Sequence, residues 1–234
     1  MDGFFFIALP YLALVLAFGV GGYRYVFNRY TYSSLSSQLL ENRKLFWGSV
    51  TWHYGLTLIL LAHLFAAFLP GVTEAILGGN IRRAVIEITG MALGLYTLFG
   101  LIVLIARRLT PRSLAQKVTT YMDGVLLFVL LVQIASGVGV AIFNRWGGLW
   151  YLRTAVPWFW SIAWLHPDAS TVNTMPILPS LHFVTGFVVI LLFPFSRLVH
   201  LIMFPIHYLW RPRQVVIWNR EPGRTIDSSK RVTG

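Results

Sequence analysis

The chain of 234 residues is 56% hydrophobic and only 12% charged, and its mean hydropathy is +0.68. Soluble domains have about 25% charged residues, so this composition excludes an ordinary soluble protein and indicates a polytopic α-helical membrane protein. The net charge of +11 does not indicate nucleic-acid binding, because loop arginines and lysines in a membrane protein set its topology.

Five apolar stretches are long enough to cross a bilayer as helices, which takes about 20 residues each. They predict an all-α fold with a transmembrane domain over residues 1–205 and a basic cytoplasmic tail over residues 206–234. The first stretch has no charged segment before it and no small-residue cleavage site, so we expect a retained helix rather than a signal peptide. The spans are expected at residues 3–24, 46–69, 85–106, 121–143 and 180–205.

The segment from 144 to 179, between the fourth and fifth spans, is long and rich in tryptophan. Its run WYLRTAVPWFWSIAWL has Arg153 within it and Pro157 at its middle, which makes it short for a span. We expect a short amphipathic element in the membrane interface, with a sixth span as the alternative.

Lysines and arginines gather in alternate connections between the spans. They occur between the first and second spans, in ARRLTPRSLAQK between the third and fourth, and in the tail. The positive-inside rule puts these segments on the cytoplasmic side. We therefore expect a multi-pass protein of the cell membrane with its N-terminus outside and its C-terminus in the cytoplasm.

Histidines within the spans are the main functional signal, since an ionisable side chain in a bilayer is costly and is usually functional. His53 and His63 lie in the second span, and His182 and His200 lie in the fifth. The two spans run in opposite directions, so depth pairs His53 with His200 near the cytoplasm and His63 with His182 near the outer face. The helical rise gives ~15 Å between His53 and His63 and ~27 Å between His182 and His200. Unequal helix tilt or a distortion near Pro194 has to absorb this difference.

These residue types suit haem iron. A neutral imidazole ligates iron through one ring nitrogen, and two imidazoles leave no open position, so such a haem transfers electrons. Two haems b between the second and fifth helices, each with iron held by one histidine pair, are therefore predicted. The absence of cysteine excludes an iron–sulfur cluster, a thiolate-bound haem and c-type attachment in this chain. His166 and His207 are expected to be ordinary surface residues.

Basic residues near the cytoplasmic ends of the spans are candidates for binding the anionic haem propionates. Arg197 stands one turn before His200. Arg108 and Arg112 are further candidates, although topological charge is the simpler explanation for them. Asp123 is expected to be structural. Glycines would give porphyrin faces room, although glycine is also common in helix packing; they are Gly55, Gly94, Gly100, Gly137 and Gly139.

On the outer side, Arg82 and Arg83 precede the third predicted span. A cation there would polarise a quinone carbonyl or hold an outer propionate, and the simpler reading is a solvated helix start. Glu87 is the outer carboxylate nearest to membrane depth and would accept a quinol proton. Arg82 and Glu87 are thus the candidate catalytic residues.

The chain resembles the gamma subunit of respiratory membrane-bound nitrate reductase, a diheme cytochrome b. The resemblance rests on the ten-residue step from His53 to His63, the eighteen-residue step from His182 to His200, and LLFPFSRLVH at 191–200. The order of five spans, SSQLL in the first cytoplasmic loop and the ARRLTPR connector also match.

This resemblance implies quinol oxidation near the outer face, with menaquinol or ubiquinol as the substrate. Electrons would pass through two haems b to a cytoplasmic iron–sulfur (beta) subunit and on to a molybdenum (alpha) subunit that reduces nitrate. The family has a quinol-linked lysine after an EA dipeptide, and Arg82 occupies that place after Glu74–Ala75. The alternatives are the cytochrome b of another quinone-linked oxidoreductase, of sulfur-compound or nitrite-oxidising type, and a proton-coupled transporter that uses buried histidines.

Overall fold

A computed structural model describes residues 3–27, 43–110, 120–144 and 147–201. Within these ranges the protein consists of helices joined by turns and has no β-strand, which confirms the all-α prediction. Five helical stretches are long and apolar enough to cross a membrane, as predicted. They are Phe4–Phe27, Phe46–Phe68, Asn80–Leu109, Tyr121–Phe143 and Ile177–Phe195. The predicted tail, residues 206–234, lies outside the described residues.

The first span combines α-helical and π-helical pieces. The residues at the joins stay in the right-handed helical region, so the chain runs on without a break. Its pieces are η1 (Phe4–Ala8), α1 (Leu9–Val15), η2 (Leu16–Val20) and α2 (Gly21–Phe27).

Three long helices form the middle of the fold: α3 (Arg43–Phe68), α5 (Asn80–Leu109) and α7 (Tyr121–Phe143), with the short α4 (Pro70–Leu77) after α3. Helix α5 begins five residues earlier than expected, so Arg82 and Glu87 lie on its first turns rather than at or before its start. Hydropathy underestimates the length of this helix because its first turns are polar.

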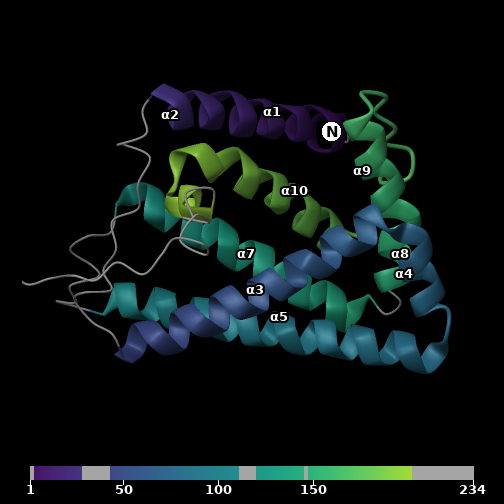
Figure 1. Ribbon diagram of the computed structural model, residues 1–234, viewed down its shortest axis with the longest axis horizontal. Helices are drawn as coiled ribbons and strands as arrows, with labels where there is room; N and C mark the ends of the chain where they lie inside the picture. The colour runs from purple at the N-terminus through teal and green to yellow at the C-terminus, as the bar shows by residue number, and fades with distance from the viewer. Residues whose placement is uncertain (1–2, 28–42, 111–119, 145–146, 202–234) are drawn as a thin grey trace, which may run out of the picture. The chain divides into compact units, whose positions relative to one another are not determined.

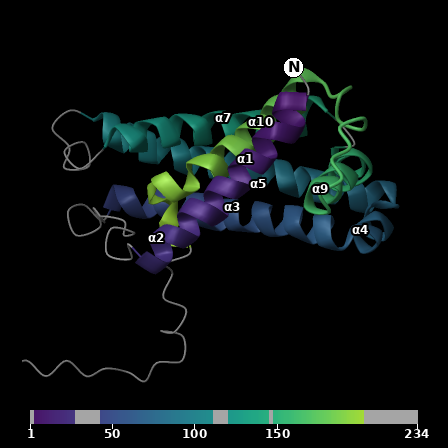
Figure 2. The ribbon, with the colours of Figure 1, turned by 90° about the horizontal axis from the view of Figure 1, so that it is seen from above.

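The helices lie side by side as neighbours in space (Figures 1 and 2). Helix α3 packs against α5, α5 packs against α7, α7 packs against α10 (Ile177–Leu192), and α1 packs against α10. The two histidine-bearing helices, α3 and α10, therefore find their main packing partners in α5 and α7 rather than in each other.

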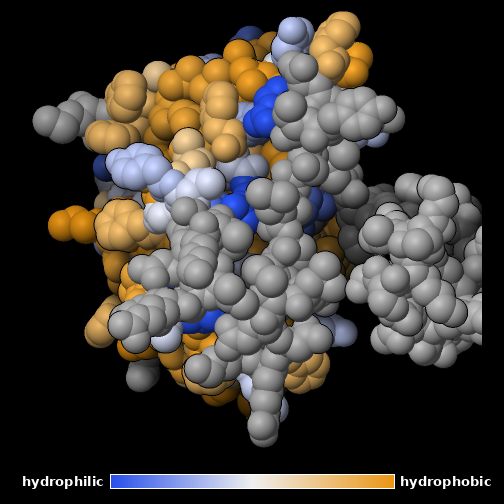
Figure 3. Space-filling view, turned by 90° about the vertical axis from the view of Figure 1, so that its left-hand side faces the viewer, coloured by the Kyte–Doolittle hydropathy of each residue, from blue (hydrophilic) through white to orange (hydrophobic). Residues whose placement is uncertain are grey.

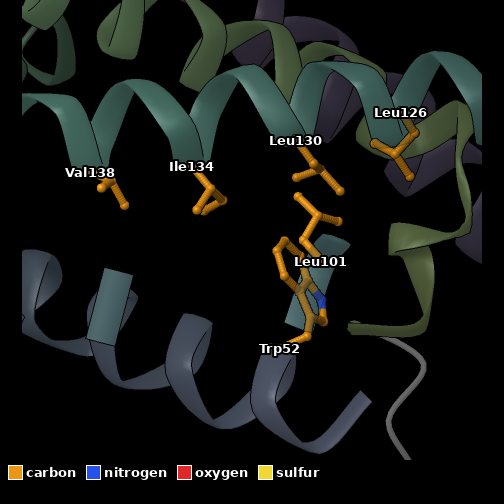
Figure 4. Close-up of a cluster of buried hydrophobic side chains, with 6 residues drawn as sticks. All are labelled: Trp52, Leu101, Leu126, Leu130, Ile134 and Val138. Carbon is orange, nitrogen blue, oxygen red and sulfur yellow. The ribbon is translucent and has the colours of Figure 1, made fainter. Parts of the chain in front are cut away.

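A buried cluster holds α3, α5 and α7 together. Its α7 members recur every four residues, so they share one face of that helix and point toward α5 and α3 (Figure 4). The cluster consists of Trp52, Leu101, Leu126, Leu130, Ile134 and Val138.

Glycines allow α3 and α5 to approach closely. A Cβ atom added to Gly100 would lie 2.6 Å from the backbone nitrogen of Trp52, and one added to Gly55 would overlap the hydroxyl of Thr97. Gly94 similarly meets Val138 of α7 at 3.1 Å. These three glycines serve helix packing, as small residues do in membranes, rather than making room for a porphyrin.

Residues 147–163, here called the aromatic cap, are helical throughout: α8 (Gly147–Trp150), η4 (Tyr151–Ala155) and α9 (Val156–Ala163). The cap is not among the five candidate spans, so the short element is confirmed over the alternative of a sixth span. Trp158, which is 2% exposed, donates to the carbonyl of Phe6, and Trp160 donates to that of Ala67. The cap thereby binds the ends of the first two spans.

The fifth span, expected over residues 180–205 with unequal tilt or a distortion near Pro194, is not one regular helix. Helix α10 ends at Leu192 and is followed by two 3₁₀ segments, η5 (Phe193–Phe195) and η6 (Arg197–Leu201), on either side of an extended Ser196. Pro194 is the physical reason, since its ring clashes with the preceding turn and it has no N–H to donate. His182 and His200 therefore do not share one face of a straight helix.

Candidate functional site

His53 of α3 and His200 of η6 face each other, with ring centroids 6.1 Å apart and ring planes at 71°. Imidazoles on opposite sides of one metal ion have centroids roughly 6 Å apart, given metal–nitrogen bonds of about 2 Å and about 1 Å from nitrogen to ring centre. The structure thus brings together the two histidines that depth pairs at this end. It does so at a spacing that a shared metal ion would need.

His63 lies at the other end of α3, and the His182 side chain of α10 is near enough to it for an electrostatic interaction. The His182 ring lies against Gly137 of α7, where an added Cβ would come within 2.8 Å of its Cε1. The amide nitrogen of Gln133 stands 3.5 Å from His182 Nε2, at the limit of a hydrogen bond. Gly137 therefore makes room for an imidazole.

All four histidines contact a backbone carbonyl through the same ring nitrogen. Their Nδ1 atoms lie 2.6–3.0 Å from backbone carbonyl oxygens, which are those of Ser49, Ile59, Gln133 and Arg197. A carbonyl only accepts, so Nδ1 carries the proton in each case and Nε2 keeps its lone pair. Donation from Nδ1 to a carbonyl is the arrangement that orients a metal-ligating histidine.

His53, His63 and His200 are exposed on the surface of the chain, and His182 is half-buried. Exposed imidazoles at membrane depth are costly unless a partner covers them. Among the described residues no group of three or more metal-ligating side chains occurs. A pair of imidazoles fits a metal that takes two protein ligands, as haem iron does.

The end of the bundle that holds His53 and His200 is called the basic end here. The buried carboxylate of Asp123 lies there, 2.9 Å from Arg197 Nε and 3.7 Å from an Arg108 nitrogen. Asp123 also caps α7 through a reciprocal pair of bonds with Thr120, which agrees with the structural role expected for it. Arg112 lies outside the described residues.

Arg24 adds a further cation at the basic end by donating to the carbonyl of Pro194. Where side chains are visible from this end, hydrophilic ones lie among hydrophobic ones (Figure 3). A mixture of apolar and charged side chains suits a bundle end at a membrane surface.

At the opposite end, Arg82 Nη2 donates to the carbonyl of Ala75 at 3.4 Å. One carboxylate oxygen of Glu87 accepts a 3.4 Å bond from the backbone N–H of Gly148 in the aromatic cap. The structure thus places both candidate residues on α5 near the cap. The bond of Arg82 and the bond of Glu87 are both to backbone groups, and neither bond is to His63.

Comparison with known proteins gives a consistent result. A family model described as nitrate reductase gamma subunit matches residues 2–219. The nitrate reductase gamma chain of Bacillus subtilis is 34% identical over 87% of this chain and 92% of its own length. The respiratory nitrate reductase 1 gamma chain of Escherichia coli is 33% identical over 92% of this chain and 97% of its own. The chain belongs to the nitrate reductase gamma subunit family.

A third relative of this gamma subunit family is longer. The nitrate reductase-like protein NarX of Mycobacterium tuberculosis is 30% identical over 91% of this chain but only 33% of its own length. A region similar to this chain therefore also occurs as one part of a larger protein. The family match confirms the resemblance drawn from the histidine spacings and LLFPFSRLVH.

Three side chains that contact His63 or His182 in this gamma subunit were not predicted from the sequence. Gln133 and Ser136 of α7 contact the His182 ring, and Tyr151 of the cap contacts His63. Gln133 and Ser136 carried a usable signal, because they are polar residues within a very apolar span. Tyr151 carried none, because it lies in a run of aromatic residues of similar character.

Tyr151 contacts His63 in two ways. Its ring meets the His63 ring edge to face with centroids 5.4 Å apart, and its hydroxyl donates to the His63 carbonyl at 3.2 Å. Burial raises the pKa of the Tyr151 phenol, which therefore stays protonated at neutral pH. The aromatic cap thus contacts the imidazole of His63 directly.

Proposed function

We propose that this chain is the membrane cytochrome b subunit of a nitrate reductase, oxidising quinol near the outer face and delivering the electrons to the cytoplasmic side. The observation that carries the proposal is the common orientation of four histidines in two pairs, each with Nδ1 on a carbonyl. Haem b, when bound, supplies reversible one-electron transfer at iron. Family membership supports the same role.

Each pair of histidines holds one haem b in this proposal. His53 and His200 are the ligands at the basic end, and His63 and His182 are the ligands at the end near the aromatic cap. Both ligands of a pair offer Nε2, and their Nδ1 bonds fix the ring orientation before any group binds. Their exposure fits this role, because a bound haem would shield the imidazoles from lipid.

Arginines at the basic end hold the propionates of the inner haem in this proposal. Arg108 and Arg197 lie there on different helical segments, close to the same carboxylate. Each guanidinium presents several N–H donors in a planar fork, a geometry that suits carboxylate groups. Arg112 has the same proposed role but lies outside the described residues.

The quinol site is proposed beside the outer pair, with Arg82 and Glu87 as the reacting side chains. Arg82 polarises the quinol oxygen by a charge-assisted hydrogen bond. Glu87 accepts a proton, for which its weak 3.4 Å bond from Gly148 leaves the carboxylate available. Protons released there leave on the outer side.

The orientation and partners follow from charge. The basic end lies on the cytoplasmic side and the aromatic cap on the outer side, with the N-terminus outside and the C-terminus in the cytoplasm. An iron–sulfur subunit docks on the basic surface and passes electrons to a molybdenum subunit that reduces nitrate. The chain itself, a multi-pass protein of the cell membrane, transfers electrons and does not reduce nitrate.

Optical spectroscopy of the purified membrane complex tests this function. We expect pyridine haemochrome analysis to find two haems b per gamma chain and a quinol analogue to reduce both. A chain without haem would instead support a histidine-dependent transporter. Two haems that quinol does not reduce would favour a cytochrome b that works toward quinone. Identifying the copurifying subunits separates a nitrate reductase from a sulfur-compound or nitrite-oxidising complex.

A further inference from the structure

His200 does not lie on a regular helix. It follows the break at Pro194 and sits on η6, a segment of five residues. Among the described residues, Ser196 donates to the Phe193 carbonyl from its backbone N at 3.3 Å and from its Oγ at 3.2 Å, and Leu198 N donates to Ser196 Oγ at 3.3 Å. A short 3₁₀ segment is weakly held by its own bonds, so contacts from other helices have to fix its place.

The contact best suited to fix η6 comes from Asp123. This carboxylate is 4% exposed, and its Oδ1 lies 2.9 Å from Arg197 Nε. Its Oδ2 accepts from the backbone N–H of Thr120 at 2.9 Å, in the capping box that begins α7. Asp123 is therefore fixed at a helix start, and it holds the first residue of η6 by charge and by a directed hydrogen bond.

Arg197 continues this contact to the histidine. Its backbone carbonyl accepts the Nδ1 proton of His200 at 2.6 Å, while its side chain pairs with Asp123. The same residue is thus anchored through its side chain and orients the imidazole through its backbone. A displacement of Arg197 would turn the ring of His200 away from His53, whose ring centroid lies 6.1 Å away.

We propose that Asp123 is a positioning residue for His200, and through it for the haem at the basic end. The inference rests on the proposed function, in which His200 ligates that haem. Asp123 touches neither imidazole of the pair in this arrangement and acts through Arg197. The carboxylate of this ion pair is only 4% exposed, so breaking the pair is expected to affect η6 more than loss of an ordinary surface pair would.

The competing explanation is that Asp123 only caps α7. Two substitutions separate the explanations. Asp123→Asn keeps an amide oxygen for the cap but loses the charge that pairs with Arg197. Thr120→Ala loses a capping bond but keeps the ion pair. The structure therefore offers one variant for each role.

The experiment uses the full membrane complex with each substitution. The haem content, the low-spin EPR signals and the midpoint potentials of both haems are measured, and His53→Ala identifies which signals belong to the basic end. We expect Asp123→Asn to shift the EPR signal and potential of that haem or to reduce its occupancy, with the outer haem unchanged. Thr120→Ala should leave both signals in place.

Unchanged signals of the basic-end haem in Asp123→Asn would overturn the inference, as would equal changes of both haems in both variants.

A double-mutant comparison adds a second test. If Asp123 acts through Arg197, Asp123→Asn should add little to the spectral change caused by Arg197→Gln, and full additivity would contradict the inference. If Asp123→Asn does not accumulate, Arg197→Gln replaces it, and native signals of the basic-end haem in that variant would count against the proposal. Absence of haem in the native complex would instead refute the proposed function.

Discussion

At the basic end, His53 and His200 donate to carbonyls of their own helical segments, whereas at the capped end His182 donates to a carbonyl of the neighbouring helix α7. The orientation of His182 therefore depends on how α7 and α10 pack. The orientation of His200 depends instead on where a short segment lies after a break. Two pairs with the same chemistry are thus sensitive to different changes in the protein.

Loss of a ligand should have the largest effect and should divide the four histidines into two pairs. His53→Ala and His200→Ala should remove one and the same haem, while His63→Ala and His182→Ala should remove the other, because each pair holds one iron. Haem counts and EPR of the membrane complex measure this. His166→Ala, in a turn outside the spans, is the control and should keep both haems. Loss of a common haem in His53→Ala and His63→Ala would refute the pairing.

Crowding at Gly137 should disturb only the capped end. Its added Cβ would approach His182 Cε1 to 2.8 Å, so Gly137→Ala forces the imidazole to move. Overpacking costs about 1–3 kcal/mol, and we expect lower occupancy or a shifted spectrum of the outer haem. Gly139→Ala is the matched control on the same helix, because its Cβ meets the flexible end of Leu178 at 2.9 Å. Equal effects of the two substitutions would argue against the specific contact.

Removal of the Arg82 cation should slow quinol oxidation while both haems remain. A charge-assisted hydrogen bond is worth ~1.5–3 kcal/mol, so Arg82→Ala should lower the rate of quinol-dependent haem reduction by roughly ten- to a hundredfold. Arg82→Lys should have a milder effect because the charge remains. Stopped-flow reduction by a quinol analogue measures this, with Arg153→Ala as a control for an exposed arginine. Native kinetics in Arg82→Ala would place the quinol site elsewhere.

The smallest effect is expected at Tyr151. Tyr151→Phe keeps the ring against His63 but removes the hydroxyl that donates to the His63 carbonyl. One such bond contributes about 0.5–1.5 kcal/mol. We therefore expect the midpoint potential of the outer haem to shift by at most the equivalent of this free energy, while the midpoint potential of the inner haem stays unchanged. A redox titration resolved by EPR measures it. A response of the inner haem instead would show that the two ends are coupled.

The five spans could be predicted from the sequence, because an uninterrupted apolar stretch of spanning length has few stable structures other than a membrane-spanning helix. The sequence also indicated the partner of His53, since opposite helix directions order the histidines by depth. It was not sufficient for the end of α10. Pro194 indicated a distortion, but whether a helix kinks or ends at a proline depends on the neighbours that take up the unsatisfied groups.

The finer site contacts could not be predicted for a similar reason. Asp123 and Arg197 are far apart in the chain, and only the packed helices bring the carboxylate and guanidinium together. Gln133 of α7 contacts His182 of α10, and no hydropathy pattern specifies how these two helices are rotated relative to each other. Polar residues within apolar spans indicate that a contact exists, but not which partner they meet.

The bonds of the aromatic cap to the first span join residues that are synthesised far apart in time. Trp158 donates to Phe6 and Tyr11 donates to Ile162, which separates the bonded residues by 152 and 151 positions. At synthesis rates of about 5–20 residues per second, the first helix waits on the order of 10 s in the bilayer before these partners emerge. Its other main neighbour, α10, is made later still. The first helix to enter the membrane is therefore among the last to dock.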